Sequence, residues 1–241
     1  MRSDKPRLNA IASHPAIVVM VKAPRAGEAK TRLTPFLSKA EAGALAACFA
    51  QDVVATARRV ARDVIVAYTP RGGRRALEAL LPHDLLWMEQ QGADLGARLD
   101  SAVGRAAALG FSPVIVVGAD SPTLPPQLIE TAIGALAARE ADIALGPTED
   151  GGYYLIGLRR PVRNLFQNIA WSTSFVYRQT AETAARMGLR LHELPRFYDV
   201  DTPADLLRLR ERIYQDKDAQ ERAAATYRWL LAHEPLALRS A

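Results

Sequence analysis

The stretch PVIVVGADSPTLPP, residues 113–126, decides the fold. Its four apolar residues 114–117 are too few for a helix and too uniformly apolar for a strand with one solvated face, so they predict a buried central strand. Glycine, aspartate and proline then end the strand. Because an open α/β sheet binds its ligands just beyond the carboxyl ends of its strands, Asp120 is a candidate ligand for a substrate or a metal ion. Alternatively, Asp120 only caps the helix that follows Pro126 or closes an Asx turn.

On both sides of this stretch, short apolar runs alternate with longer alanine-rich or amphipathic segments. The pattern predicts strands at residues 16–21, 63–68, 85–89, 142–145, 153–158 and 190–194. It predicts helices at 39–62, 71–81, 126–140 and 173–187, a helix ending near 109 and another starting at 203. Capping residues mark three helix starts: Ser38 with Glu41, Thr202 with Asp205, and Ser172. This alternation, without an internal linker, predicts an α/β protein.

The two ends of the chain are expected to differ from its middle. Residues 1–14 are interpreted as a flexible arm, residues 15–213 as one domain, and residues 214–241 as a helical tail that frays at its end. The tail would pack through Trp229, Leu230 and Leu231, and it could support contacts in a homo-oligomer.

Composition and charge argue against several classes of protein. No apolar run approaches the roughly 20 residues needed to span a bilayer, and the N-terminal segment lacks the apolar core of a signal peptide. We therefore expect a cytoplasmic protein. The net charge of +5 comes from scattered arginines without a nucleic-acid motif, so it favours anionic substrates such as phosphates over nucleic acid. The one cysteine, Cys48, cannot form an internal disulfide and is expected to be buried in a helix.

A basic loop, KAPRAGEAKTRLTP, follows the first strand at residues 22–35. It carries one acidic residue, Glu28, and four cations, Lys22, Arg25, Lys30 and Arg32. A loop of this kind at a strand end can wrap phosphates with backbone N–H groups and cationic side chains. It matches neither the GxxxxGK[ST] phosphate loop nor the GxGxxG dinucleotide fingerprint. On charge alone, a solvated basic loop is the more common case.

Acidic residues recur at two further strand ends. In GPTEDGGYYLIGL, residues 146–158, Glu149 and Asp150 precede two glycines, which suits either a tight turn or a site with room for a ligand. In YDVDTPADL, residues 198–206, Asp199 and Asp201 alternate and so point to the same side of an extended backbone. Carboxylates brought together repel unless a cation lies between them or one is protonated. Hard oxygen ligands of this kind suit Mg²⁺ or Mn²⁺.

One more segment, QQGADLG at residues 90–96, places two glycines close to a strand end, where they permit either a flat ligand against the backbone or an ordinary connection. Taken in order, VVMVKAPRAGEAKTRL, QQGADLG, VVGADSPTLP and DGGYYLIGL with YDVDTPADL resemble the GT-A-like nucleotide-diphospho-sugar transferase superfamily. Within it they resemble transferases similar to 2-phospho-L-lactate guanylyltransferases and molybdenum-cofactor nucleotidyltransferases. The resemblance covers residues 17–213 and implies a single-domain three-layer α/β/α sandwich with a mostly parallel, Rossmann-like sheet.

The resemblance also implies a role for each motif. The loop after the first strand would hold nucleotide phosphates through Lys22, Gly27, Lys30 and Arg32. The segment QQGADLG would face the base through Gln91, Gly92, Leu95 and Gly96. A divalent cation, Mg²⁺ or Mn²⁺, would bind Asp120 together with Asp201 or Asp199, and the segment from Asp150 to Tyr153 would face the acceptor. The molybdenum-cofactor enzymes carry more glycine in the first loop, so their choice of nucleotide is not transferred.

Two chemistries suit such a site. In the leading hypothesis, a nucleotidyltransferase, a phosphorylated acceptor attacks the α-phosphorus of an NTP and releases pyrophosphate. Lys30 and Arg32 then neutralise phosphate charge, and Asp120 and Asp150 take part at the reacting groups. In the alternative, a glycosyltransferase uses a nucleotide-sugar, and Asp150 or Glu149 is the general base for a hydroxyl acceptor. A third hypothesis is a regulatory module that binds a nucleotide without turnover.

Overall fold

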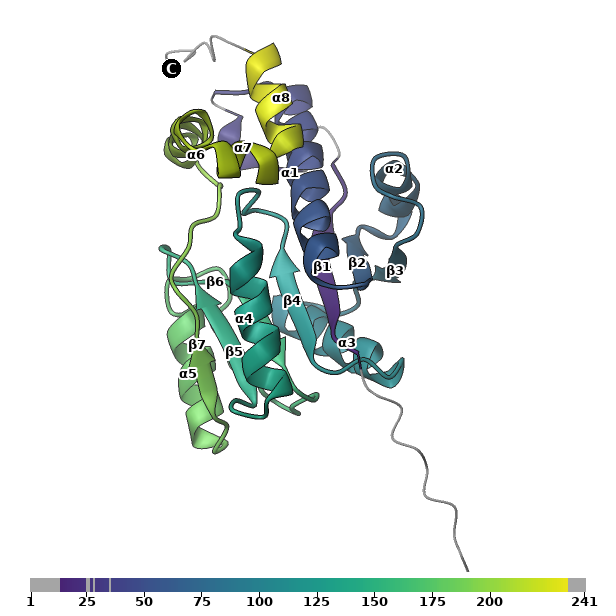
Figure 1. The fold of residues 1–241 in the computed structure, drawn as a ribbon, viewed down its shortest axis with the longest axis vertical. Coiled ribbons are helices and arrows are strands. Elements are labelled where there is room, and N and C mark those ends of the chain that lie inside the picture. Colours follow the sequence, from purple (N-terminus) through teal and green to yellow (C-terminus); the bar gives the residue numbers. More distant parts are fainter. Residues whose placement is uncertain (1–13, 25–26, 28, 35, 234–241) are drawn as a thin grey trace, which may run out of the picture.

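A seven-stranded sheet forms the middle of the molecule, in the order β3-β2-β1-β4-β6-β5-β7 (Figure 1). The structure is a computed structural model, and it describes residues 14–24, 27, 29–34 and 36–233. Most of the expected arm at residues 1–14 and the end of the expected tail lie outside these ranges. The strands are β1 (Ala16–Lys22), β2 (Asp63–Thr69), β3 (Leu86–Glu89), β4 (Val114–Gly118), β5 (Ile143–Pro147), β6 (Tyr153–Leu158) and β7 (Leu191–Glu193).

The sheet is mostly parallel, as the family resemblance implies. β1 pairs in parallel with β2 and β4, β2 with β3, and β5 with β7, whereas β6 runs antiparallel to both β4 and β5. A strand with neighbours on both sides and helices on both faces must be apolar along its whole length. The residues of β4 from Val114 to Val117 are accordingly no more than 2% exposed.

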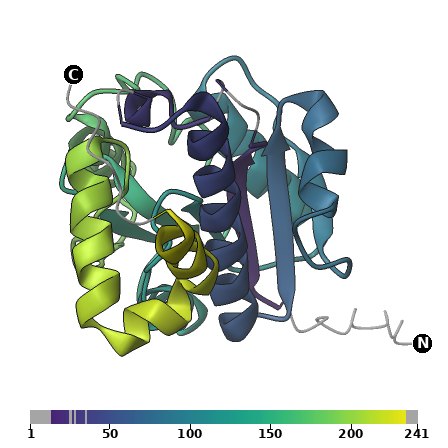
Figure 2. The ribbon, with the colours of Figure 1, turned by 90° about the horizontal axis from the view of Figure 1, so that it is seen from above.

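Helices cover both faces of the sheet, which completes the three layers (Figure 2). Alternate residues of the strands pack on opposite sides. Val18 and Val116 belong to the cluster that contains α3 (Leu95–Ala108) and α5 (Val176–Arg186). Ile17 and Ile115 belong to the cluster on the other face, with α1 (Lys39–Val60), α4 (Pro126–Ala137), α6 (Pro203–Gln215), α7 (Lys217–Arg222) and α8 (Ala224–Ala232). α2 (Arg74–Glu78) completes the set of helices in the described ranges.

Helix starts that depend on local capping agree with the sequence analysis. Ser38 and Thr202 both form capping boxes with the acidic residue three positions later. In contrast, α5 begins at Val176, and Ser172 lies outside it with a left-handed φ of +64°. The predicted helix at 71–81 is a 3-10 turn followed by the short α2.

The described part of the tail packs on the domain. α8 packs on α1, with Trp229 and Leu230 buried, although Leu231 is 50% exposed and does not pack as predicted. Cys48 in α1 is only partly buried. No helix in the described ranges has the length and apolar character needed to cross a membrane.

Candidate functional site

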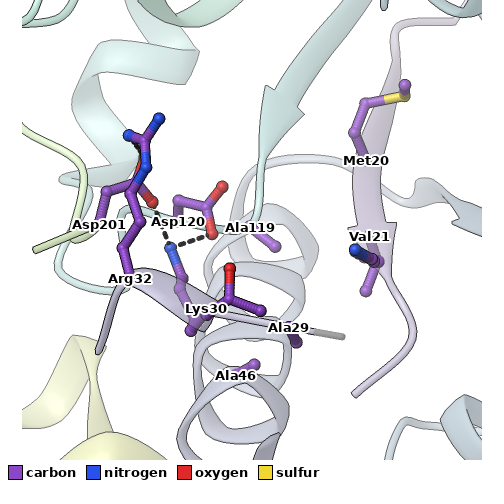
Figure 3. Close-up of a pocket in the computed structure, with 11 residues that line it drawn as sticks. Met20, Val21, Ala29, Lys30, Arg32, Ala46, Ala119, Asp120 and Asp201 are labelled. Atoms are coloured by element: carbon purple, nitrogen blue, oxygen red, sulfur yellow. Dashed lines mark hydrogen bonds and ion pairs between the residues drawn. The ribbon is translucent and has the colours of Figure 1, made fainter. Parts of the chain in front are cut away.

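The candidate site lies where β1 and β4 end. The strand order reverses at β1, because β2 and β3 lie on one side of it and β4 lies on the other. Open α/β sheets bind their ligands at such a point of reversal. β1 ends at Lys22, and β4 ends two residues before Asp120. A cavity of about 270 Å³, here called the first cavity, opens between these ends (Figure 3). It is lined by Met20, Val21, Lys22, Ala29, Lys30, Thr31, Arg32, Ala46, Ala119, Asp120 and Asp201.

The late Asp-Val-Asp motif is held against the loop that follows β4. The Val200 N–H donates to the Asp120 carbonyl at 3.0 Å. The Ser121 hydroxyl donates to the Tyr198 carbonyl at 2.9 Å, and the hydroxyls of Thr123 and Tyr198 lie 2.7 Å apart. Two motifs that are about 80 residues apart in the chain are therefore joined side by side.

Asp120 does not cap the following helix. The residue at the cap position of α4 is Pro125, which has no side-chain cap. The Asp120 carboxylate instead lies 2.5 Å from the Lys30 ammonium. Of the two interpretations of Asp120, this contact favours a residue of the site.

The Lys30 ammonium lies between two of the expected metal ligands. It is 2.5 Å from Asp120 Oδ1 and 2.9 Å from Asp201 Oδ1 (Figure 3). It also donates to the Val200 carbonyl at 2.6 Å. Its side chain is 7% exposed, and the Phe49 ring lies 5.5 Å away. Burial alone would lower the pKa of Lys30, but the two carboxylates outweigh burial and raise it above its ordinary value. Lys30 is therefore charged.

The residues present do not fit a divalent ion in this conformation. Within the part of the chain that the structure describes, no three His, Cys, Asp or Glu side chains come together as metal ligands. The position between Asp120 and Asp201, where we expected Mg²⁺ or Mn²⁺, is taken by the Lys30 ammonium. Asp199 lies close to the site but outside this group. Its pKa is raised to about 6 by burial and by the charges of Asp150 and Asp201.

A second cavity, of about 400 Å³, adjoins the first and shares Arg32 and Asp201 with it. Three carboxylates, several hydroxyls and the indole of Trp171 face it, and Arg32 is its one cationic residue among those described. Its lining consists of Arg32, Leu95, Thr148, Asp150, Gly152, Tyr153, Trp171, Ser172, Thr173, Ser174, Val176, Asp199 and Asp201. The pair of cavities thus has a cationic side and an acidic, hydroxyl-rich side.

The structure separates the two residues considered as a general base. The Asp150 carboxylate lines the second cavity and accepts hydrogen bonds from the Thr148 hydroxyl at 2.5 Å and the Gly152 N–H at 3.0 Å. Glu149 instead accepts two hydrogen bonds from the Arg208 guanidinium, at 2.5 and 2.8 Å. Arg208 holds the pKa of Glu149 below its usual value. Asp150 is therefore the better placed of the two.

The turn after Asp150 requires glycine. Gly151 has a left-handed φ of +91°, and a Cβ on it would lie 2.1 Å from the Ser174 carbonyl oxygen. The Gly151 carbonyl also accepts a hydrogen bond from the Tyr177 N–H at 2.9 Å. Close packing of these two backbones brings the loop 172–174 over the second cavity.

Gly27, Gly92 and Gly96 lie at turns or at close packing contacts. Gly96 is buried, and a Cβ on it would lie 2.7 Å from the Trp171 ring. Gly92 and Gly27 have left-handed φ values of +140° and +82°. Neither Gln91 nor these two glycines lines the first or the second cavity, whereas Leu95 lines the second.

Sequence reasoning missed several residues of the second cavity, among them Thr148, Trp171, Ser172 and Ser174. A signal was available in the run AWSTSF, residues 170–175, where three hydroxyl residues follow a tryptophan. Ser172 was interpreted as a helix cap, because serine before a helical pattern usually is one.

Comparison with known proteins agrees with the fold described above. A solved structure of a proposed nucleotide-diphospho-sugar transferase from Desulfovibrio desulfuricans G20 is 33% identical to the chain, with a TM-score of 0.85, and the match covers 93% of this chain and 96% of that one. The fold and this relative place the chain in the superfamily that its motifs resemble, the GT-A-like nucleotide-diphospho-sugar transferases. It belongs to the family described as "Uncharacterized protein conserved in bacteria (DUF2064)", whose model matches residues 52–173.

Two more distant structures share the fold alone. One is a CMP:2-keto-3-deoxy-manno-octonic acid synthetase solved with CTP, which is 16% identical, with a TM-score of 0.57 over 84% of this chain and 99% of that one. The other is the molybdopterin-guanine dinucleotide biosynthesis protein A of Archaeoglobus fulgidus, which is 12% identical, with a TM-score of 0.54 over 83% and 100%. None of the curated proteins compared with the sequence matches it.

Proposed function

We propose that the chain is a nucleotidyltransferase that moves a nucleoside monophosphate from an NTP to a small acceptor and releases pyrophosphate. The observation that carries this proposal is the pair of cavities that meet at Arg32 and Asp201. A transfer reaction needs its two substrates in contact at one point, with the reacting atoms about 3 Å apart. The first cavity would take the donor and the second the acceptor.

The charge of the first cavity supports a triphosphate donor. Lys22, Lys30 and Arg32 line it, and the carboxylates of Asp120 and Asp201 offset part of their positive charge. An NTP carries more negative charge than the diphosphate of a nucleotide-sugar, so the remaining excess of positive charge favours the NTP. In such a reaction, positive groups that face the phosphates stabilise the charge that builds up on the leaving pyrophosphate.

The second cavity favours an acceptor with an uncharged hydroxyl group. We expected a phosphorylated acceptor, but the carboxylates of Asp150, Asp199 and Asp201 would repel an anion, and Arg32 alone would attract it. Carboxylates accept hydrogen bonds from hydroxyl groups, and a hydroxyl acceptor needs a base to remove its proton. Asp150 and Asp199 both face the cavity, and Asp199, with a pKa of about 6, is close to the range that suits a general base near neutral pH.

Glycosyl transfer is the second candidate function. The same carboxylates would serve as the base for a hydroxyl acceptor, and the Desulfovibrio relative is described as a proposed nucleotide-diphospho-sugar transferase. The two candidates differ in the donor, which is an NTP in one and a nucleotide-sugar in the other.

A thermal-shift panel tests the proposal. The purified chain is heated with ATP, GTP, CTP, UTP, UDP-glucose or GDP-mannose, each with and without Mg²⁺ or Mn²⁺. A donor at about a hundred times its dissociation constant adds roughly 2.7 kcal/mol to the stability, which shifts the melting temperature by several degrees. We expect one NTP to stabilise the chain. Stabilisation by a nucleotide-sugar alone would favour glycosyl transfer, and no stabilisation by any donor would contradict both candidates.

A further inference from the structure

The environment of the Lys30 side chain is a complete shell for a cation. An ammonium group has three N–H donors. Those of Lys30 are matched by three oxygens within 3 Å, from the carboxylates of Asp120 and Asp201 and the carbonyl of Val200. With its side chain 7% exposed, Lys30 is shielded from solvent, while Asp120 and Asp201 remain 52% and 39% exposed.

The same three oxygens are the kind of ligands that a hard divalent ion binds. Mg²⁺ and Mn²⁺ prefer carboxylate and carbonyl oxygens. The Val200 N–H donates to the Asp120 carbonyl, which holds the two loops that supply these oxygens side by side. A divalent ion and an ammonium cannot both lie among these oxygens, since like charges a few ångströms apart repel strongly in a partly buried site.

We propose that Lys30 is the resident cation of the first cavity, and that its ammonium keeps a divalent ion from binding Asp120 and Asp201 in the free protein. The proposal concerns the protein without nucleotide and does not depend on the proposed function.

The backbone of Lys30 has an unusual, left-handed conformation. Lys30 has φ +50° and ψ +41°, the left-handed conformation that residues with a Cβ rarely adopt. It precedes the 3-10 turn of residues Thr31–Leu33, and the Leu33 N–H donates to its carbonyl at 2.9 Å. The three ammonium contacts and this backbone hydrogen bond help to offset the cost of the left-handed conformation.

Mn²⁺ binding to the free protein tests the exclusion, with electron paramagnetic resonance to count free and bound ion. No nucleotide is present. Lys30→Met removes the charge and keeps a side chain of similar length. We expect this variant to bind one Mn²⁺ at least about tenfold more tightly than the wild type does, because a buried like charge is gone. In the double variant K30M/D120N the gain should disappear, which would assign the ion to this shell.

Lys22→Met is the matched control. Lys22 lines the same cavity, but it has no ion pair with either carboxylate among those found in the described residues. The wild type and K22M should bind Mn²⁺ with similar affinity. If the wild type binds Mn²⁺ as tightly as K30M does, the proposal is overturned. It is also overturned if the Mn²⁺ affinity of K30M is no higher than that of K22M.

Circular dichroism establishes that each variant is folded before its affinity is compared. If K30M does not fold, Lys30→Gln replaces it, because the amide can still donate hydrogen bonds to the carboxylates without a charge. The same expected gain and the same contrary results apply to K30Q. All of these measurements omit the nucleotide, so their failure would leave the proposed function standing. A donor panel without stabilisation would in turn contradict only the proposed function.

Discussion

The carboxyl group of Asp199 has a raised pKa, of about 6, because it is partly buried and because Asp150, Asp201 and Asp120 carry like charges near it. The folded state therefore binds this proton more tightly than the unfolded chain, whose aspartates have a pKa near 3.9. Unfolding then releases the proton, so this group's contribution to stability falls as the pH rises from about 4 to about 6 and stays low above that range.

Asp199→Asn should raise the free energy of unfolding at pH 7.5 by about 1 kcal/mol, a value reduced from the full shift because the group is partly exposed. Below about pH 4 the variant and the wild type should be equally stable. Urea unfolding followed by circular dichroism between pH 4 and 7.5 measures the difference. Asp52 titrates in the same range, so the pH dependence should weaken rather than vanish. An unchanged pH dependence in the variant would show that Asp199 is not the group responsible.

Gly151→Ala tests the close packing of the turn against the loop 172–174. A Cβ would lie 2.1 Å from the Ser174 carbonyl, and the φ of +91° is unfavourable for alanine, so we expect a loss of about 2 kcal/mol or more. Gly188→Ala is the control, because Gly188 also has a left-handed φ, +68°, but no atom lies within 4 Å of the Cβ position. Its loss should be about 1 kcal/mol. Equal losses in urea unfolding would mean that the contact with Ser174 contributes nothing.

Single residues differ in how far the sequence alone could place them. Asp120 could be placed at the sheet edge, because the apolar run before it marks a buried strand and a strand end is a local feature. The partner of Lys30 could not be predicted, since Asp201 is 171 residues away and is brought there by the hydrogen bonds of Val200 and Tyr198. The metal site was expected from the family resemblance and from the alternation of Asp199 and Asp201, and neither of these shows that a lysine lies between the carboxylates.

At the level of elements, α8 depends on a side chain from α1. The Asp52 carboxylate is buried and accepts hydrogen bonds from the N–H groups of Ala225 and Thr226, at 2.8 and 2.9 Å, and from the Thr226 hydroxyl at 2.6 Å. These N–H groups belong to the first turn of α8, where no earlier helical carbonyl can accept them. Asp52 therefore does what a local N-cap residue usually does.

Asp52→Ala should lower the free energy of unfolding by about 2 to 4 kcal/mol, because it leaves three buried donors without their acceptor. Amide hydrogen exchange should show the faster exchange first in α8. Asp52→Asn, which keeps one acceptor oxygen, should lose less. If D52A exchanges in α8 at the wild-type rate, the helix does not depend on this contact.

The strands and the capped helices are the elements that the sequence predicted best. The strand residues of β1 and β4 are buried on both faces and so appear as continuous apolar runs, and the capping boxes of α1 and α6 are complete within four residues. The start of α5 was predicted too early, because the loop 172–174 packs on Gly151 instead of forming a first turn. The attachment of α8 depends on Asp52, more than 170 residues earlier, which no local pattern reports.

For the molecule as a whole, the order of the strands explains why one edge of the sheet holds two cavities. β1 and β4 end beside the first cavity, and the turn between the antiparallel β5 and β6 reaches the second with Thr148, Asp150 and Gly152. The segment 199–201 returns from β7 and lies between them, so Asp201 faces both. Arg32, 74% exposed at its side chain and 3.9 Å from Asp201, is the other shared residue.

This arrangement predicts that Arg32 acts on both substrates, whereas its neighbours act on one. In the proposed reaction, Arg32→Ala should weaken the binding of the NTP and raise the KM of the acceptor, each by about tenfold, the size expected for loss of one charge-assisted contact. Lys22→Ala should affect the NTP alone, and Ser174→Ala the acceptor alone, because each lines a single cavity. Isothermal titration with the NTP and pyrophosphate-release kinetics at varied acceptor concentration separate the two effects. An R32A variant that changes only one of them would mean that the two cavities do not share a reacting point, and the assignment of donor and acceptor sides would then fail.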